Sequence, residues 1–293
     1  MAQSPVIVGV DPTPAGALAA TVGCAVAGAM EAPCHLVHVV REPAGLSRGK
    51  AESTERADTL DRFLDATRSA LERSLAPHLT ASALEHLDVH VGNPAWVLGQ
   101  VARDDGARLL VLGGKHHSAA VRWFGGSTAH HAVRTIDVPL LVAAAPKTRF
   151  DRVLVACDLS DASAPTLEAA RAFGRPFGAR LRMLTVVEPL PAIPDVGIQI
   201  DEGERLRVTE QEAAALVAGG GNEDRVESIV QTGSAARTIA DEVARWDADI
   251  VVVGSHGKGW VDRVLLGSTT ERLLNRLPCS ILVIPIRGPG IGT

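Results

Sequence analysis

The chain carries the same order of sequence segments twice, and this internal repeat constrains its fold more than any other feature. The stretch VIVGVD, Val6–Asp11, returns in similar form as VLVACD, Val153–Asp158. Later, GGSTAHHAVRTIDVPLLVAA from Gly125 matches LGSTTERLLNRLPCSILVIP from Leu266. At 293 residues the chain has the length of two ordinary domains. The repeat therefore predicts a tandem duplication with domains 1–147 and 148–293.

Each copy alternates short apolar runs with helical patterns, which is typical of α/β proteins. The apolar runs are continuous rather than alternating, as expected for parallel strands covered by helices on both faces. We predict two tandem Rossmann-like domains, each with a five-stranded parallel sheet of order 3-2-1-4-5. The longest helix is expected over Glu52–Leu75. The predicted strands are Val6–Val10, Leu36–Val40, Leu87–Val91, Leu109–Leu112 and Leu140–Ala143, then Val153–Ala156, Leu181–Val187, Val226–Gln231, Ile250–Val253 and Ser280–Ile284.

Composition excludes several classes of function. Aromatic residues make up 3% of the chain and the net charge is −5, so a nucleic-acid-binding surface is not expected. No apolar run reaches membrane-spanning length, and the first residues do not resemble a signal peptide. The four cysteines are scattered without a C-x-x-C motif, so we expect reduced thiols and a cytoplasmic protein. They are Cys24, Cys34, Cys157 and Cys279.

The stretch GSHGKGWVDRVLLGST, Gly254–Thr269, is the strongest candidate for a binding loop. It follows the fourth strand of the second copy, whereas Asp158 ends the first strand, and neighbouring strands would bring both to one crevice. Glycines let backbone N–H groups approach a ligand, and the helix that starts after Gly267 attracts anions. The loop therefore suits phosphates, and Asp158 suits an amino or hydroxyl donor, which together describe a nucleotide. The loop matches neither a P-loop nor a dinucleotide fingerprint.

The spacing G-2x-G-9x-G-[ST] after a strand, with an Asp ending the first strand, resembles the universal stress protein family in its tandem form. The resemblance covers essentially the whole chain. Many members of that family bind ATP, and others lack the glycines and do not. It implies that Asp158 faces the adenine or ribose, with the backbone near Val186 beside the base. The loop positions implied in nucleotide binding are Gly254, Ser255, His256, Gly257, Gly267, Ser268 and Thr269.

Simpler structural roles stay open for several of these residues. The glycines are also common turn residues, and Asp158 could cap the turn into the next helix. Ser268 and Glu271 form a capping-box pattern, with Ser268 as the N-cap. A carboxylate there repels phosphate, so either Glu271 shifts on binding or Mg²⁺ lies between them. Cys157, beside Asp158, is read as a packed thiol rather than a redox switch.

The first copy has a degenerate version of the motif, because His116 stands where the second copy has Gly257. This degenerate motif predicts either a weaker anion-binding site in the first domain or no site there. The candidate residues of this second site are Asp11, Val39, Gly113, Gly126, Ser127 and Thr128. Four histidines flank the loop, namely His116, His117, His130 and His131, and a metal site there is the less favoured alternative, because adjacent pairs rarely aim both rings at one ion.

The resulting hypothesis is a cytoplasmic tandem universal stress protein that binds ATP, or ADP or AMP, through its second domain. It would act as a regulatory or sensing module in the stress response, with an unidentified protein partner and no catalytic residue or protein-held metal assigned. One alternative is a slow Mg²⁺-dependent ATPase or phosphotransferase that uses His256, and another is a nucleotide-free interaction scaffold. We expect the two domains to form an intramolecular pseudo-dimer, with a homodimer as a further arrangement.

Overall fold

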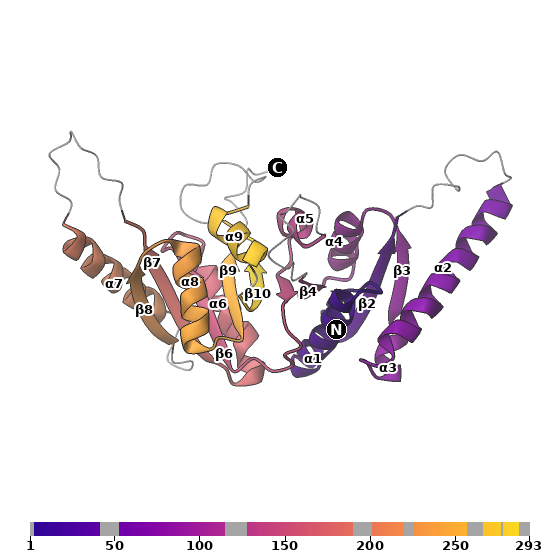
Figure 1. Cartoon of the computed structure of the whole chain (residues 1–293), viewed down its shortest axis with the longest axis horizontal. Helices are drawn as coiled ribbons and strands as arrows, with labels where there is room; N and C mark the ends of the chain where they lie inside the picture. The colour runs from indigo at the N-terminus through magenta and orange to yellow at the C-terminus, as the bar shows by residue number, and fades with distance from the viewer. Residues whose placement is uncertain are drawn as a thin grey trace. The chain divides into compact units, whose positions relative to one another are not determined.

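The computed structural model describes residues 3–41, 53–114, 128–189, 201–219, 226–256, 266–276 and 278–286. The chain divides into two compact units, Met1–Thr148 and Arg149–Thr293. Figure 1 shows that strands and helices alternate in both units.

The first unit contains five strands and the helices between them. Its elements are β1 (Val6–Gly9), α1 (Pro14–Ala29), β2 (Cys34–Val40), α2 (Ser53–Leu75), α3 (Ala81–Leu84), β3 (Leu87–Val91), α4 (Pro94–Asp104), β4 (Leu109–Gly113), α5 (Thr128–Thr135) and β5 (Leu140–Ala143).

The second unit repeats this order, with one short 3-10 helix after its first α-helix. Its elements are β6 (Arg152–Cys157), α6 (Ser163–Gly174), η1 (Arg175–Phe177), β7 (Arg180–Val187), α7 (Glu202–Ala218), β8 (Val226–Thr232), α8 (Ala235–Trp246), β9 (Ile250–Gly254), α9 (Ser268–Arg276) and β10 (Ser280–Ile284).

The strand order within each unit confirms the predicted fold class. The first unit has the order β3-β2-β1-β4-β5, and the second has β8-β7-β6-β9-β10. Every neighbouring pair for which a register is given in these two sets is parallel. All ten predicted strands are present, and the largest difference is at β2, which begins at Cys34 instead of Leu36. The long helix α2 begins one residue after its predicted start.

The central strands form the core because their continuous apolar runs are covered on both faces. In β9, Ile250, Val251 and Val252 are fully buried. Burial of such a side chain stabilises the fold by about 1.5–3 kcal/mol relative to exposure. In the second unit, α6 packs on β6 and β9 while α8 and α9 pack against each other (Figure 1).

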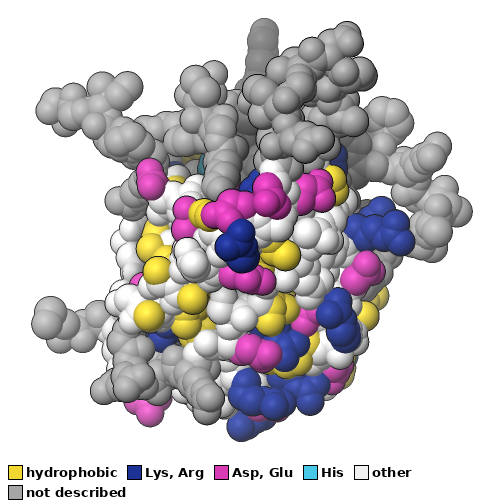
Figure 2. All heavy atoms as spheres, turned by 90° about the vertical axis from the view of Figure 1, so that its left-hand side faces the viewer, with side chains coloured by type: hydrophobic (Ala, Val, Ile, Leu, Met, Phe, Trp, Pro, Cys, Tyr) yellow, Lys and Arg dark blue, Asp and Glu magenta, His cyan; other side chains and the backbone are white. Residues whose placement is uncertain are grey.

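The edge of the second unit where α7 and β8 lie carries side chains of mixed character. Figure 2 shows acidic, basic and apolar side chains together on this face. Helix α7 is capped by Asp201, whose Oδ1 accepts hydrogen bonds from the backbone N–H groups of Gly203 and Glu204. Acidic residues at its first turn also favour the helix dipole. Within the part of the chain that the structure describes, no helix is both long and apolar enough to cross a membrane.

Candidate functional site

Three predicted site residues meet at the carboxyl edge of the second sheet. Strand β6 lies between β7 and β9, with Cys157 opposite Thr185 and Ala156 opposite Val253. Asp158 follows β6 directly, Val186 lies near the end of β7, and Gly254 ends β9. This edge is where the strand order reverses, which is the usual ligand position in such sheets.

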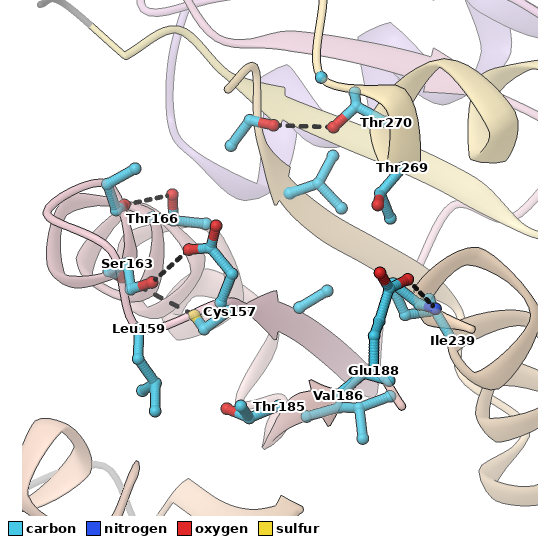
Figure 3. Close-up of a pocket in the computed structure, with 18 of the residues that line it drawn as sticks. Cys157, Leu159, Ser163, Thr166, Thr185, Val186, Glu188, Ile239, Thr269 and Thr270 are labelled. Atoms are coloured by element: carbon cyan, nitrogen blue, oxygen red, sulfur yellow. Dashed lines mark hydrogen bonds between the residues drawn. The ribbon is translucent and has the colours of Figure 1, made fainter. Parts of the chain in front are cut away.

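A cavity of about 590 Å³ opens at this edge, within the size range of small-molecule sites. Its lining residues come from β6, β7 and β9 and from α6, α7, α8 and α9, and Figure 3 shows most of them. Seven residues predicted from the sequence line it: Asp158, Val186, Gly254, His256, Gly267, Ser268 and Thr269. Gly257 lies outside the described residues.

Asp158 both lines the cavity and organises the turn that follows β6. It lines the cavity, and its Oδ1 also accepts hydrogen bonds from the backbone N–H of Ser160 at 3.0 Å and from the Ser160 hydroxyl at 2.5 Å. The Ser163 hydroxyl donates to the same oxygen at 3.3 Å. The carboxylate is therefore held in place by the turn that it organises, and the side chain is pre-positioned at the cavity wall.

The turn after Asp158 places a bulky residue in an uncommon backbone conformation. Leu159 has φ 59°, in the left-handed region, and lines the cavity. A side chain of this kind rarely adopts that region, and such strain is concentrated at functional sites. Cys157, on the other side of Asp158, is buried, and burial raises the pKa of its thiol to about 12. Cys157 is therefore a neutral thiol near neutral pH.

The other end of the cavity is built by the first turn of α9. Helix α9 begins at Ser268, and the carbonyl of Gly267 accepts a hydrogen bond from the backbone N–H of Glu271 at 2.9 Å. The N-cap is therefore Gly267, one residue earlier than the capping-box pattern predicts. The Thr270 hydroxyl donates to the carbonyl of Gly254 at 2.9 Å and joins the first turn of α9 to the end of β9.

Ser255 and His256 lie between the two ends but differ in their relation to the cavity. Ser255 is buried, and its hydroxyl oxygen accepts a hydrogen bond from the backbone N–H of Ile286 at 3.0 Å. The same oxygen lies 2.9 Å from Nδ1 of His256. His256 lines the cavity. Ser255 is not among the lining residues, but its hydroxyl contacts the ring of His256.

Charged side chains that the motif does not contain also line the cavity. Glu188, at the end of β7, accepts a hydrogen bond through Oε1 from the backbone N–H of Ala235 at 3.0 Å. It thereby caps α8, whose own N-cap residue makes no side-chain cap bond. Arg205 of α7 donates through Nη2 to the carbonyl of Glu188 at 2.6 Å, and Arg272 reaches the cavity from α9. Sequence reasoning missed these three because helix packing, not loop spacing, brings them here.

The first unit keeps the aspartate turn of the second. Oδ1 of Asp11 accepts hydrogen bonds from the backbone N–H of Thr13 at 3.0 Å and from the Thr13 hydroxyl. Of the remaining predicted residues, Val39 lies in β2, Gly113 ends β4 and Thr128 begins α5. Gly126 and Ser127 lie outside the described residues.

The first unit packs more closely than the second at the position equivalent to Gly254. Helix α1 begins at Pro14, three positions after Asp11, whereas α6 begins at Ser163, five positions after Asp158. An early start fits proline at the first helical position. A Cβ on Gly113 would lie 1.9 Å from the carbonyl oxygen of Ala15, so close packing against α1 already explains that glycine. The weaker second site stays a prediction.

Most histidines of the alternative metal site lie outside the described residues. His116, His117 and the side chain of His130 lie outside the part of the chain that the structure describes. His131 is exposed on α5. Across the described residues there is no group of three or more His, Cys, Asp or Glu side chains that could hold a metal ion.

Comparison with known families agrees with the duplicated architecture. The model of the universal stress protein family matches the chain twice, over residues 4–144 and 149–285. The chain belongs to the universal stress protein family. Universal stress protein A homolog 2 of Coxiella burnetii is 28% identical over 143 residues, which cover 47% of this chain and 97% of that protein. Universal stress protein A homolog of Pasteurella multocida is 28% identical over 142 residues, covering 47% and 98% respectively.

Solved universal stress proteins share the fold over both units. A crystal structure from Archaeoglobus fulgidus covers 96% of this chain and 98% of its own, with a TM-score of 0.65 and 18% identity. A putative universal stress protein from Pseudomonas aeruginosa covers 97% and 94%, with a TM-score of 0.64 and 14% identity. At these identities the likeness concerns the fold.

Proposed function

We propose that the second unit of this universal stress protein binds ATP, or a related adenine nucleotide, and that the protein acts as a regulatory or sensing module. The observation that supports this most directly is the composition of the cavity. One wall holds Asp158 and Val186, and the other holds Gly254 and the start of α9. An acceptor for a nucleoside and a helix N-terminus for phosphates thus face a single space of about 590 Å³.

The charged side chains that line the cavity favour one orientation of the bound nucleotide. Asp158 and Glu188 lie at the β6–β7 side, where carboxylates accept hydrogen bonds from amino and hydroxyl groups of a nucleoside. Apolar side chains of Val186 and Ile239 offer a surface for the flat face of a base. Phosphates are directed to the opposite side, where the first turn of α9 and Arg272 favour negative charge. Mg²⁺ would enter with ATP as the counter-ion of its phosphates.

The test is to identify the ligand that the protein itself selects. Freshly purified protein is denatured, and the released small molecules are analysed by mass spectrometry. An adenine nucleotide, in an amount close to one per chain, supports the proposal. Protein that releases no nucleotide and is not stabilised against heat by added ATP, ADP or AMP would instead support the scaffold alternative.

The enzyme alternative has its own readout. His256 lines the cavity, and its contact with the Ser255 hydroxyl restrains the ring, so it is the residue on which an ATPase would depend. If the protein hydrolyses labelled ATP well above the buffer background and His256→Ala abolishes this activity, the protein is a slow ATPase rather than a sensing module. Binding without turnover keeps the proposed function.

A further inference from the structure

Two cysteines of the first unit lie in direct contact although ten positions separate them in the sequence. Cys24 lies in α1 and Cys34 is the first residue of β2. Their Sγ atoms are 2.9 Å apart, and both residues are half-buried rather than enclosed. A disulfide bond is about 2.05 Å long, so a displacement of about 0.9 Å would join the two sulfur atoms.

The turn between helix and strand holds the two thiols together. Helix α1 ends at Ala29, and Glu31 takes φ 52°, in the left-handed region, which reverses the chain within a few residues. The backbone N–H of Ala32 donates to the carbonyl of Ala27 at 2.9 Å. The carbonyl of Pro33, beside Cys34, accepts from Val6 at 2.8 Å, which fixes the start of β2. The contact between the Cys24 and Cys34 thiols therefore depends on the folded structure.

We propose that Cys24 and Cys34 form a redox site that reacts with a peroxide and closes to an intramolecular disulfide. The proposal concerns the first unit and does not depend on nucleotide binding by the second. In a reducing compartment such a disulfide is transient, which is the behaviour of redox-sensing pairs.

The chemistry balances with hydrogen peroxide as the oxidant. The Cys24 thiolate attacks one peroxide oxygen, the O–O bond breaks, and Cys24 sulfenic acid and hydroxide form. The sulfur of Cys34 then attacks the sulfur of Cys24, the S–O bond breaks, and the departing hydroxide leaves as water with the thiol proton. The two thiols together lose two protons and two electrons, and the peroxide becomes two molecules of water. A dithiol reductant returns the disulfide to two thiols by thiol–disulfide exchange and is itself oxidised to a disulfide.

The roles of the two thiols follow from their shared hydrogen bond. The contact with Cys34 lowers the pKa of Cys24, whereas the contact with Cys24 and burial raise the pKa of Cys34. Cys24 is thus the attacking thiolate and Cys34 the resolving thiol. The second unit offers internal controls, because burial raises the pKa of Cys157 to about 12 and the Sγ of Cys279 contacts the carbonyl of Ser280.

The sequence makes the disulfide easy to detect. The first Lys or Arg is Arg41, so both cysteines fall in one tryptic peptide, residues 1–41. Glu31 lies between them, so cleavage after glutamate separates the two halves. The reduced, folded chain is treated with hydrogen peroxide, its remaining thiols are alkylated, and the peptides are analysed by mass spectrometry.

We expect peptide 1–41 to be lighter by two hydrogen atoms and free of alkyl groups, while Cys157 and Cys279 stay alkylated. Cleavage after Glu31 should leave two halves that dithiothreitol separates. The variants Cys24→Ser and Cys34→Ser should show no link, and Cys24→Ser should leave Cys34 unoxidised. The same treatment in urea should link the cysteines at least about tenfold more slowly, because the fold supplies the proximity.

Two results would overturn the proposal. One is full alkylation of Cys24 and Cys34 after peroxide treatment that oxidises a free model thiol. The other is a link that forms as fast in urea as in the folded chain, since the pair would then owe its reaction to sequence proximity alone.

Discussion

The Thr270 hydroxyl lies 2.9 Å from the carbonyl oxygen of Gly254 and donates a hydrogen bond to it. This bond joins the first turn of α9 to the end of β9, the two elements between which the glycine loop runs. A second bond, from the backbone N–H of Gly267 to the carbonyl of Ser255 at 2.9 Å, lies beside it. The two ends of the loop are therefore fixed, and α9 points its first turn into the cavity.

Thr270→Val should weaken both the fold and the nucleotide site, because the shape is kept while the hydroxyl is lost. Thr270 is 4% exposed, so the Gly254 carbonyl would lose a partner in a place with little water. We expect a loss of about 1 kcal/mol in the free energy of unfolding. ATP affinity, measured by calorimetry, should fall as well. The matched control is Thr232→Val, at the exposed end of β8, which should leave both quantities unchanged.

Asp158→Ala should weaken ATP binding by about 1–3 kcal/mol, the range for hydrogen bonds that involve a charged group. Asp158→Asn keeps an oxygen for the Ser160 turn and removes the charge, so it separates binding from folding. Asp11→Ala removes the same kind of turn in the first unit and should leave the ATP affinity of the second unit unchanged. Equal affinities of the parent and a folded Asp158→Ala chain would remove Asp158 from the site.

Arg272→Ala should reduce affinity for ATP by about tenfold, or about 1.4 kcal/mol, while adenosine binding stays the same. The reason is that Arg272 lines the cavity from α9, on the side assigned to the phosphates. Arg276→Ala changes an exposed arginine in the last turn of the same helix and serves as the control. If Arg272→Ala weakened adenosine binding as much as ATP binding, Arg272 would act on the nucleoside and not on the phosphates, which contradicts the prediction.

The fold was predictable because it depends on local patterns. Continuous apolar runs ending in Asp158 or Gly254 give parallel strands with both faces covered, and a few topological rules then give the strand order. The glycine spacing likewise marked one wall of the cavity, where Gly254 and Gly267 lie. In both cases the information lies in short stretches of sequence.

The rest of the site depends on packing between distant elements, which the sequence does not display. Glu188 and Arg205 line the cavity because α7 and α8 pack beside β7, and no motif spans them. The N-cap is Gly267 rather than Ser268, and the Thr270 hydroxyl bonds to a strand carbonyl, a contact that the local sequence pattern does not contain. Cys24 and Cys34 looked scattered, since a helix-to-strand crossover, and not their spacing, puts them in contact.

Glu242→Ala should destabilise the second unit without weakening nucleotide binding in the folded protein. Glu242 is 1% exposed, and its Oε1 lies 2.7 Å from Nη1 of Arg182. Its Oε2 accepts a hydrogen bond from Gln231 at 2.9 Å, and Arg182 also lies over the ring of Trp246. Loss of one partner of a buried ion pair costs about 3–5 kcal/mol.

Urea denaturation measures this loss of stability. Asp241→Ala breaks an exposed contact with Arg237 in the same helix and should change the free energy of unfolding by less than about 1 kcal/mol. A Glu242→Ala chain as stable as that control would show that the buried network contributes little.

The most direct test of the central claim, that the second unit binds adenine nucleotide through its glycine loop, is a calorimetric titration of ATP into the parent chain and Gly257→His. The substitution copies His116, the aligned residue of the first copy, into the second. A side chain there hinders close approach of the backbone to phosphate. We predict one ATP per parent chain and an affinity at least about tenfold lower, about 1.4 kcal/mol, in the variant. Absence of binding to the parent, or equal affinity in a folded Gly257→His chain, would contradict the account.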